Sequence, residues 1–403
     1  MNILFLTLID MCSVSEHGIY QDLVRELIRK GNRVYVVSPS ERRTGQNTRI
    51  IDDGVCKILK VRIGNTQKTN IIEKGISTVL IEPQFKAAIR KHLADVKFDL
   101  VLYSTPPITF ASVVEYVKKR DGAKSYLLLK DIFPQNAVDM GMMSKTGPKS
   151  AIYHFFRRKE ERLYALSDQI GCMSLANVNY VLEHNPKVDG ARVEVCPNSI
   201  EPRDLSLDEA DRAAMRRKYG IPEDKRVFVY GGNLGKPQSI PFIIECLKSQ
   251  ADNAGAYFLI VGDGTEYPKL EEYVARSGQS NLKLMKRLPK EDYDRMIAAC
   301  DVGLIFLDHR FTIPNFPSRL LSYMQAKLPV LACTDPNTDI GEVIVQGGFG
   351  WWCESNDVNA FAATVSQAMQ LPLKELGEAG ARYLAENYTV DISCDTILSC
   401  VRV

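Results

Sequence analysis

A glycine-rich loop at residues 230–236, with the sequence YGGNLGK, has the residue types best suited to phosphate chemistry. It follows an apolar stretch directly and precedes a stretch with helical periodicity. Glycines let a backbone approach a phosphate closely, so that its amides can surround the oxygens. Gly232, Asn233 and Gly235 would supply that backbone, and Lys236 would neutralise charge. A glycine turn without a ligand has the same pattern, so the loop alone leaves both interpretations open.

A second cation stands at the start of a predicted helix over residues 318–326. Serine is a favoured N-cap residue, so Ser318 is the expected cap. A cation in the first turn opposes the positive end of the helix dipole, so a bound anion would explain Arg319 better than solvent alone. Together with the glycine loop, this favours a diphosphate; an exposed arginine in water is the alternative.

Three residues of the first half follow predicted strands, where ligands of parallel sheets bind. His17 and Gly18 lie between the first strand and the first helix, and Asp131 follows a strand at residues 125–129. Each could equally be a structural loop residue. The first loop has no GxGxxG pattern, which argues against a dinucleotide enzyme, and the chain has no nucleophile elbow, HExxH or P-loop.

Elements that could position these residues alternate along the chain. Strands at 2–9 and 33–37 enclose a helix at 18–30, and a second alternating series begins at residue 226. Residues 197–202, with two prolines, interrupt the pattern and mark a linker. Two such series predict an α/β protein with two doubly wound, Rossmann-like domains.

Composition limits the class of protein. The 403 residues carry a net charge of +2, with 45% apolar and 25% charged residues, as in ordinary soluble proteins. The ten cysteines form no CxxC pair, which predicts buried free thiols in a reducing compartment. The start lacks a basic leader and no apolar run approaches the length of a spanning helix, so we expect a cytoplasmic protein. Neither a metal nor a nucleic acid is an expected partner.

Several short motifs occur in a specific order over nearly the whole chain. They are DIFP at 131–134, PNS at 197–199, GNLGK at 232–236, LIVGDG at 259–264, DVGL at 301–304, FPSRLLSYM at 316–324 and LPVL at 328–331. In this order they resemble the retaining glycosyltransferases of family 4, which have the fold called GT-B. Within that family the chain is most similar to enzymes that build capsular, O-antigen or other lipopolysaccharide repeats.

The resemblance implies two Rossmann-like domains facing across a cleft. Residues 1–200 would bind the acceptor, residues 201–380 would bind the nucleotide sugar, and a C-terminal helix within 381–403 would return to the first domain. It also implies a hexosyltransferase-type enzyme of class EC 2.4 that retains the anomeric configuration. UDP is the expected nucleotide, and no cofactor or metal is expected.

The resemblance also implies roles for single residues. Lys236, Ser318 and Arg319 would hold the donor pyrophosphate, and Gly18 would face it from the other domain. Asp131 matches a position near the transferred sugar where many relatives carry histidine. The turn at 286–289 would line the nucleobase, through Arg287 and Leu288.

Two departures concern the donor sugar. Many relatives carry two glutamates eight residues apart, and Pro314 and Ser322 stand at those positions. Ser322 would then bind a ribose hydroxyl, while backbone amides of Asn315 and Phe316 would contact sugar or phosphate. The missing carboxylates also leave open a catalytically inactive relative that acts as a binding or regulatory partner. A sugar-nucleotide epimerase with the same paired domains is a further alternative.

The acceptor is expected to be a polyprenyl-diphosphate-linked or free saccharide. Residues 1–200 hold 29 Lys and Arg against 21 Asp and Glu, and the segments 153–159 and 85–92 combine positive charge with apolar side chains. An interfacial helix on anionic lipid needs both properties. Peripheral contact with the inner face of the plasma membrane is therefore one prediction, and packed helices with a solvated basic edge are the alternative.

Overall fold

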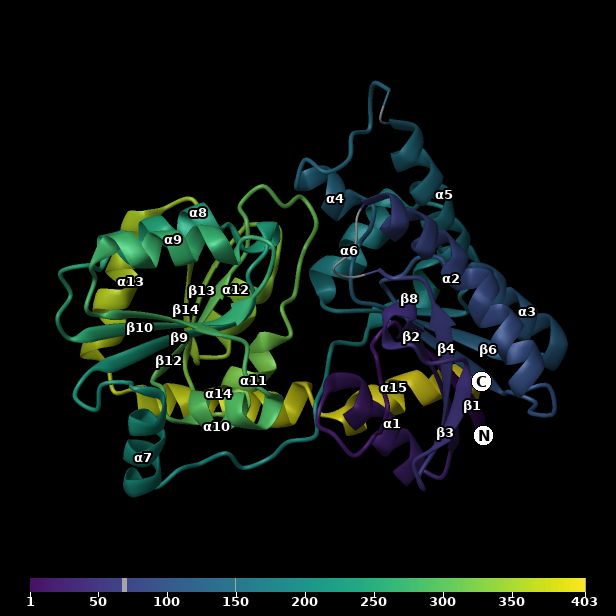
Figure 1. Cartoon of the computed structure of the whole chain (residues 1–403), viewed down its shortest axis with the longest axis horizontal. Helices are drawn as coiled ribbons and strands as arrows, with labels where there is room; N and C mark the ends of the chain where they lie inside the picture. Colours follow the sequence, from purple (N-terminus) through teal and green to yellow (C-terminus); the bar gives the residue numbers. More distant parts are fainter. Residues whose placement is uncertain (67–70, 149, 403) are drawn as a thin grey trace. The chain divides into compact units, whose positions relative to one another are not determined.

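The computed structural model describes residues 1–66, 71–148 and 150–402. They form two compact units: unit 1 contains Met1–Glu201 and Val390–Val403, and unit 2 contains Pro202–Thr389. Within each unit a sheet has helices on both faces (Figure 1). The first unit therefore consists of two separate chain segments.

Unit 1 contains an eight-stranded sheet in the order β3-β4-β2-β1-β5-β6-β7-β8, parallel except at the β3–β4 edge. Its strands are β1 Asn2–Leu6, β2 Arg33–Glu41, β3 Arg49–Asp52, β4 Lys57–Ile63, β5 Leu100–Ser104, β6 Lys124–Leu129, β7 Gln169–Cys172 and β8 Val193–Val195. Its helices are α1 Ile19–Arg29, α2 Ile71–His92, α3 Ala111–Asp121, α4 Gln135–Asp139, α5 Ser150–Leu166, α6 Leu175–His184 and α15 Val390–Arg402, with short 3₁₀ turns at Arg42–Thr44 and Gly190–Arg192.

Alternation along β1 shows why this strand is apolar throughout. Leu4 and Leu6 pack in a core with residues of α2 and α3, whereas Ile3 and Phe5 pack in a second core with α1 and α15. Successive side chains of a strand point to opposite faces, so a strand covered on both sides needs apolar residues at every position. The prediction of a central parallel strand is confirmed.

Unit 2 contains a six-stranded parallel sheet in the order β11-β10-β9-β12-β13-β14. Its strands are β9 Arg226–Asn233, β10 Ala256–Asp263, β11 Leu282–Lys286, β12 Val302–Phe306, β13 Val330–Thr334 and β14 Gly350–Glu354. Its helices are α7 Glu209–Tyr219, α8 Ile240–Ser249, α9 Tyr267–Ser277, α10 Lys290–Ala298, α11 Arg319–Gln325, α12 Ile340–Gln346, α13 Val358–Gln370 and α14 Leu373–Asn387, with a 3₁₀ turn at Lys236–Gln238.

The C-terminal segment differs from the sequence prediction in its boundary. The span 381–403 contains the end of α14 as well as α15, and only the part from Val390 belongs to unit 1; residue 403 lies outside the described residues. The helix α14 belongs to unit 2, where Gly377 lets it approach the backbone of Lys327 closely. In contrast, α15 packs on α1, where Lys30 forms ion pairs with Asp391 and Asp395.

All ten cysteines are free thiols, and nine of them are buried. The prediction of buried free thiols is confirmed for these nine, whereas Cys12 is exposed. Among the described residues, no helix has both the length and the apolar character needed to span a bilayer.

Candidate functional site

The glycine loop follows β9 at the carboxyl edge of the unit 2 sheet. Gly232 has a φ of 133°, which side-chain-bearing residues rarely adopt. The neighbouring strand β10 ends close by, since a Cβ at Gly262 would lie 2.0 Å from the Gly232 carbonyl oxygen. Glycine is therefore needed at 262 for the close approach of the two strand ends, and at 232 for the backbone conformation of the loop.

Polar groups of the loop are partly engaged within the loop itself. The buried Gln238 accepts hydrogen bonds at Oε1 from Asn233 Nδ2 at 3.0 Å and from the Gly235 amide at 3.1 Å. These two predicted phosphate ligands thus stabilise the loop in this conformation. Lys236 begins the following 3₁₀ turn with an exposed side chain, so its ammonium group is accessible to a ligand.

Arg319 lies next to the glycine loop. Its guanidinium carbon is 4.3 Å from the Tyr230 ring centroid, and its Nη2 would lie 3.4 Å from a Cβ at Gly232. Its Nη1 is buried and has no hydrogen-bond partner in the described part of the chain. The structure thus brings together two predicted site residues, Gly232 and Arg319.

Tyrosines surround this guanidinium. Tyr230 donates its hydroxyl hydrogen to the Asn233 carbonyl at 2.6 Å, and Tyr323 accepts from the Gly231 amide at 3.1 Å. Burial raises the pKa of Tyr323 to about 12, so its hydroxyl is neutral at physiological pH. Across residues 1–66, 71–148 and 150–402, no carboxylate forms an ion pair with Arg319. A positive charge therefore sits in this aromatic setting without an anionic partner.

Ser318 stands at the predicted N-cap position, but its side chain does not cap the helix. Ser318 precedes α11 but has helical dihedrals, φ −64° and ψ −13°, and its side chain makes no capping bond. A capping side chain requires an extended backbone at that residue, which this turn does not have. The short helix begins at Arg319, and Ser322 lies half-buried within it.

The other predicted donor residues lie on two loops of unit 2. Asn315 has a buried Nδ2 without a partner among the described residues, and its carbonyl accepts from Thr338 Oγ1 at 2.5 Å. Phe316 packs its ring 6.0 Å from that of Tyr388. Arg287 is exposed and Leu288 half-buried after β11. Their roles toward a ligand stay predictions.

In unit 1, Asp131 follows β6 at the carboxyl edge of the sheet. Both of its carboxylate oxygens accept hydrogen bonds from Asn136 Nδ2, at 2.7 and 2.8 Å. Burial raises the pKa of Asp131 to about 6. It also lowers the pKa of the neighbouring Lys130 to about 8, and the Lys130 ammonium donates to the Cys196 carbonyl at 3.0 Å. Sequence reasoning did not select Lys130, although it directly follows the same apolar strand.

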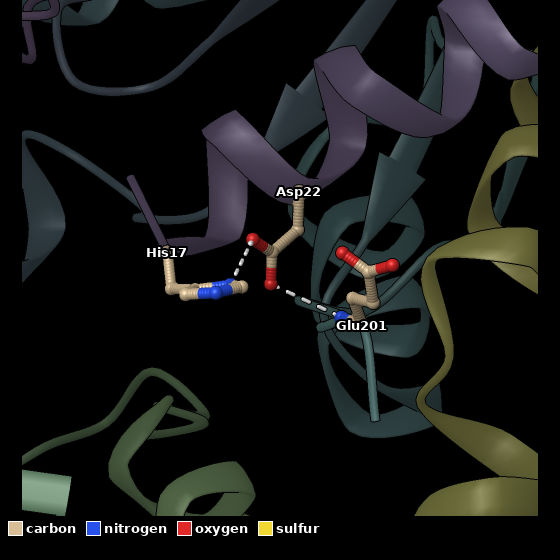
Figure 2. Close-up of side chains that lie close together, drawn as sticks. All are labelled: His17, Asp22 and Glu201. Atoms are coloured by element: carbon tan, nitrogen blue, oxygen red, sulfur yellow. Dashed lines mark hydrogen bonds and ion pairs between the residues drawn. The ribbon is translucent and has the colours of Figure 1, made fainter. Parts of the chain in front are cut away.

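His17 and Gly18 occupy the loop between β1 and α1. Gly18 has an extended backbone, φ 175°, which any residue can adopt, so its conformation does not require glycine. Its amide donates to Asp22 Oδ1 at 3.2 Å. The His17 ring faces the same carboxylate, with Nδ1 at 3.7 Å from Asp22 Oδ1 (Figure 2).

The group His17, Asp22 and Glu201 contains the atom types of a metal site. The Asp22 carboxylate also accepts a hydrogen bond from the Glu201 backbone nitrogen at 3.0 Å (Figure 2). The guanidinium of Arg25 lies within hydrogen-bond distance of all three side chains. Because a cation already neutralises the two carboxylates, this group is an ion-pair network.

The two predicted membrane segments differ in environment. Phe85 and Ile89 are fully buried in the core of unit 1 while Arg90 and Lys91 are exposed, so for residues 85–92 the structure favours the alternative, a packed helix with a solvated basic edge. This segment is apolar because it covers the sheet. In α5, by contrast, Ile152 and Phe155 are exposed.

Comparison with known proteins agrees with the two-unit architecture. Residues 20–204 match the family described as Glycosyltransferase Family 4, and residues 211–383 match the one described as Glycosyl transferases group 1. A curated relative, "Probable glycosyltransferase WbjE" of Pseudomonas aeruginosa, is 26% identical over 339 residues, which cover 84% of this chain and 82% of WbjE.

Solved structures share the fold. The structure of HepE from Anabaena in complex with UDP has a TM-score of 0.67 and 16% identity, covering all of both chains. That of WaaG, a glycosyltransferase involved in lipopolysaccharide biosynthesis, has a TM-score of 0.66 and 16% identity, covering 98% of this chain and 99% of WaaG. With two parallel-sheet α/β units and a family match in each half, the chain belongs to the glycosyltransferases with the GT-B fold.

Proposed function

We propose that the chain transfers a hexose-type sugar from a UDP-sugar to a saccharide hydroxyl, with retention, during synthesis of a surface polysaccharide. The observation that carries this proposal is Nη1 of Arg319, a buried guanidinium nitrogen beside Gly232 that has no hydrogen-bond partner in the described residues. Arginine stays charged in proteins, and an unpaired buried charge is costly. A donor diphosphate would supply the missing anion and could accept paired hydrogen bonds from the planar fork.

The neighbouring groups support the same ligand. Gly232 is exposed and has no side chain that would keep a ligand away from the loop backbone. The exposed Lys236 adds a second positive charge at the same strand end. Ligands of open α/β sheets bind beyond the carboxyl ends of the strands, where this loop lies. The relatives are consistent with this donor and product class, because HepE was solved with UDP and WaaG acts in lipopolysaccharide biosynthesis.

The proposed chemistry is a displacement on one face of the sugar. The bond from the anomeric carbon to the diphosphate oxygen breaks while a bond to the acceptor oxygen forms on the same face. The acceptor proton passes to the leaving phosphate oxygen. Lys236 and Arg319 would stabilise the negative charge that develops on the diphosphate, and such preorganised charges are often the main source of an enzyme's rate enhancement. The protein then needs no metal and no strong general base.

Nucleotide binding and transfer together test this function. We expect calorimetry to show UDP binding to the full chain, and we expect a UDP-sugar panel to give a product only when a saccharide or polyprenyl-diphosphate-linked acceptor is present. Conversion of the donor without any acceptor would identify an epimerase instead. Tight UDP binding with no transfer to any acceptor would support a binding partner and contradict the enzyme.

A lipid-linked acceptor would require unit 1 to approach a membrane. Five exposed apolar side chains lie in the first halves of two helices, and we name them the α2–α5 apolar surface: Ile76, Val79, Leu80, Ile152 and Phe155. The two helices are joined by the ion pair between Lys159 and Glu82 at 3.3 Å. Exposed cations beside the surface are Lys145, 5.9 Å from the Tyr153 ring centroid, and Arg158.

We expect the purified protein to sediment with vesicles of phosphatidylglycerol and phosphatidylcholine at low salt. Replacing Ile152 and Phe155 together by serine should weaken binding at least 10-fold, since burying one such side chain contributes about 1.5–3 kcal/mol. Val345→Ser removes an equally exposed apolar residue of unit 2 and should leave binding unchanged. Equal binding by all three proteins, or none by the wild type, would contradict membrane contact through this surface.

A further inference from the structure

Tyr230 stands in β9 directly before the glycines of the loop, and its side chain is fully buried. The ring packs in the core of unit 2, with its centroid 6.0 Å from that of Phe306 on the neighbouring strand β12. The same side chain also makes two electrostatic contacts, one through the face of its ring and one through its hydroxyl group. Each of these contacts reaches a different part of the candidate diphosphate site.

The ring contact holds the guanidinium of Arg319. The guanidinium carbon lies 4.3 Å from the ring centroid of Tyr230, within the distance at which the negative face of an aromatic ring attracts a cation. Arg319 is the first residue of the short helix α11, which no side chain caps. The long side chain of an arginine has many rotamers, so a contact with the guanidinium itself is needed to fix where its charge lies.

The hydroxyl contact holds the glycine loop. Tyr230 donates its hydroxyl hydrogen to the Asn233 carbonyl at 2.6 Å, and the next amide, that of Leu234, donates to the Asp263 carbonyl at 2.9 Å. The Asn233 carbonyl and the Leu234 amide belong to one peptide unit, which is planar. This peptide unit is therefore held at its oxygen by β9 and at its hydrogen by β10, which fixes its orientation in the middle of the loop.

We propose that Tyr230 is a positioning residue of the donor site: its ring holds Arg319 and its hydroxyl holds the glycine loop, so that both are in place before the diphosphate binds. A preorganised site binds its ligand more tightly, because less conformational freedom is lost on binding. This inference rests on the proposed function, since it takes Arg319 and the glycine loop as the groups that bind the diphosphate.

Fluorination of the ring tests the contact with Arg319 while changing the shape of the core little. In the full chain, Tyr230→Phe is compared with variants that carry phenylalanine with one, two or three ring fluorines at this position, since each fluorine weakens the negative face. We expect the Kd for UDP, measured by calorimetry, to rise along this series, by about 5- to 20-fold for the trifluoro ring. A Kd that stays constant or falls along the series would overturn the proposal.

The same series at position 306 is the matched control. Phe306 belongs to the same core as Tyr230, but its ring packs against other aromatic rings, those of Tyr230, Phe242 and Phe361. Fluorination there should leave the Kd for UDP within about 2-fold of the wild type, because no cation–π contact with Arg319 is weakened. Equal effects at the two positions would mean that fluorine acts through packing, and the role of the Tyr230 ring would be refuted.

Hydrogen exchange tests the hydroxyl contact without any ligand. Tyr230→Phe keeps the ring and removes the hydroxyl, so we expect the Leu234 amide to exchange at least about 5-fold faster than in the wild type. The Leu307 amide, which donates to the Cys333 carbonyl at 3.0 Å at the end of another strand pair, is the control and should keep its rate. An unchanged rate at Leu234 would contradict the role of the hydroxyl.

Failure of the proposed function would give a different result. If the wild type binds no UDP, the diphosphate site is refuted, and with it the role of Tyr230 in that site, whatever the exchange rate of Leu234. If the wild type binds UDP but fluorination at position 230 has no effect on the Kd, the diphosphate site stands and only the role of Tyr230 fails. The two failures are therefore distinguishable.

Discussion

Replacing Arg319 by alanine is expected to lower kcat/KM by roughly 10²- to 10³-fold, the usual cost of one preorganised donor to a developing oxyanion. The guanidinium rests on the Tyr230 ring beside Gly232 and has a buried Nη1 without a partner in the described residues. In the proposed function it would therefore meet the leaving diphosphate without moving. The kinetic constants of purified protein with a UDP-sugar give the measurement.

Two further variants show whether geometry or charge is responsible. Arg319→Lys keeps the charge but not the planar fork, so we expect an intermediate loss. Arg310→Lys changes an arginine that already binds Asp308, with Nε–Oδ1 and Nη2–Oδ2 distances of 2.8 Å, and should leave kcat within about 3-fold of the wild type. A fully active Arg319→Ala variant would remove the main support for a diphosphate site.

Replacing Lys236 by alanine is expected to reduce turnover by about 10²-fold, as for the loss of one charge that stabilises a transition state. Lys236 begins the 3₁₀ turn after the glycine loop with an exposed side chain. A compact ammonium group at that place would neutralise the phosphate that accepts the leaving charge. Removing the Lys236 ammonium should lower mainly kcat, because the negative charge on the phosphate is largest in the transition state.

Lys269 provides a matched control for this variant. It is also exposed and lies on α9, where Glu266 is its ion-pair partner. Lys269→Ala should leave kcat unchanged, since exposed pairs contribute little. Turnover near the wild-type value in Lys236→Ala would refute the phosphate role of Lys236, whatever the result for Arg319.

The central strands of both sheets could be predicted from sequence because they are covered on both faces. An unbroken apolar run such as that of β1 is typical of a strand buried on both sides. In contrast, β4 was missed because Lys60 interrupts its apolar pattern. Lys60 is 1% exposed, and its ammonium is satisfied by Asp10 and Ser38, which are far from it in sequence. No local pattern indicates such a partner.

Part of the candidate site could also be predicted from the sequence. Gly232 and Arg319 could be chosen because each stands at a junction between a predicted strand or loop and a helix. The groups that hold these residues in place could not be predicted, because they act through contacts that the local sequence does not indicate. Gln238 accepts a hydrogen bond from the Gly235 amide, and Tyr323 accepts one from the Gly231 amide. Ser318 shows the reverse error, since residue type suggested a cap that the backbone dihedrals exclude.

The pairing of α15 with α1 has a consequence for the order in which the protein is assembled during synthesis. Unit 2 is one continuous stretch, Pro202–Thr389, whereas unit 1 needs Val390–Val403 to cover the α1 face of its sheet. Domains generally fold as units as they leave the ribosome. The core of the half made first is therefore completed only after the half made second. Residues of α1 can already pack on Ile3 and Phe5, but Cys394, Ile397 and Leu398 of α15 join this core last.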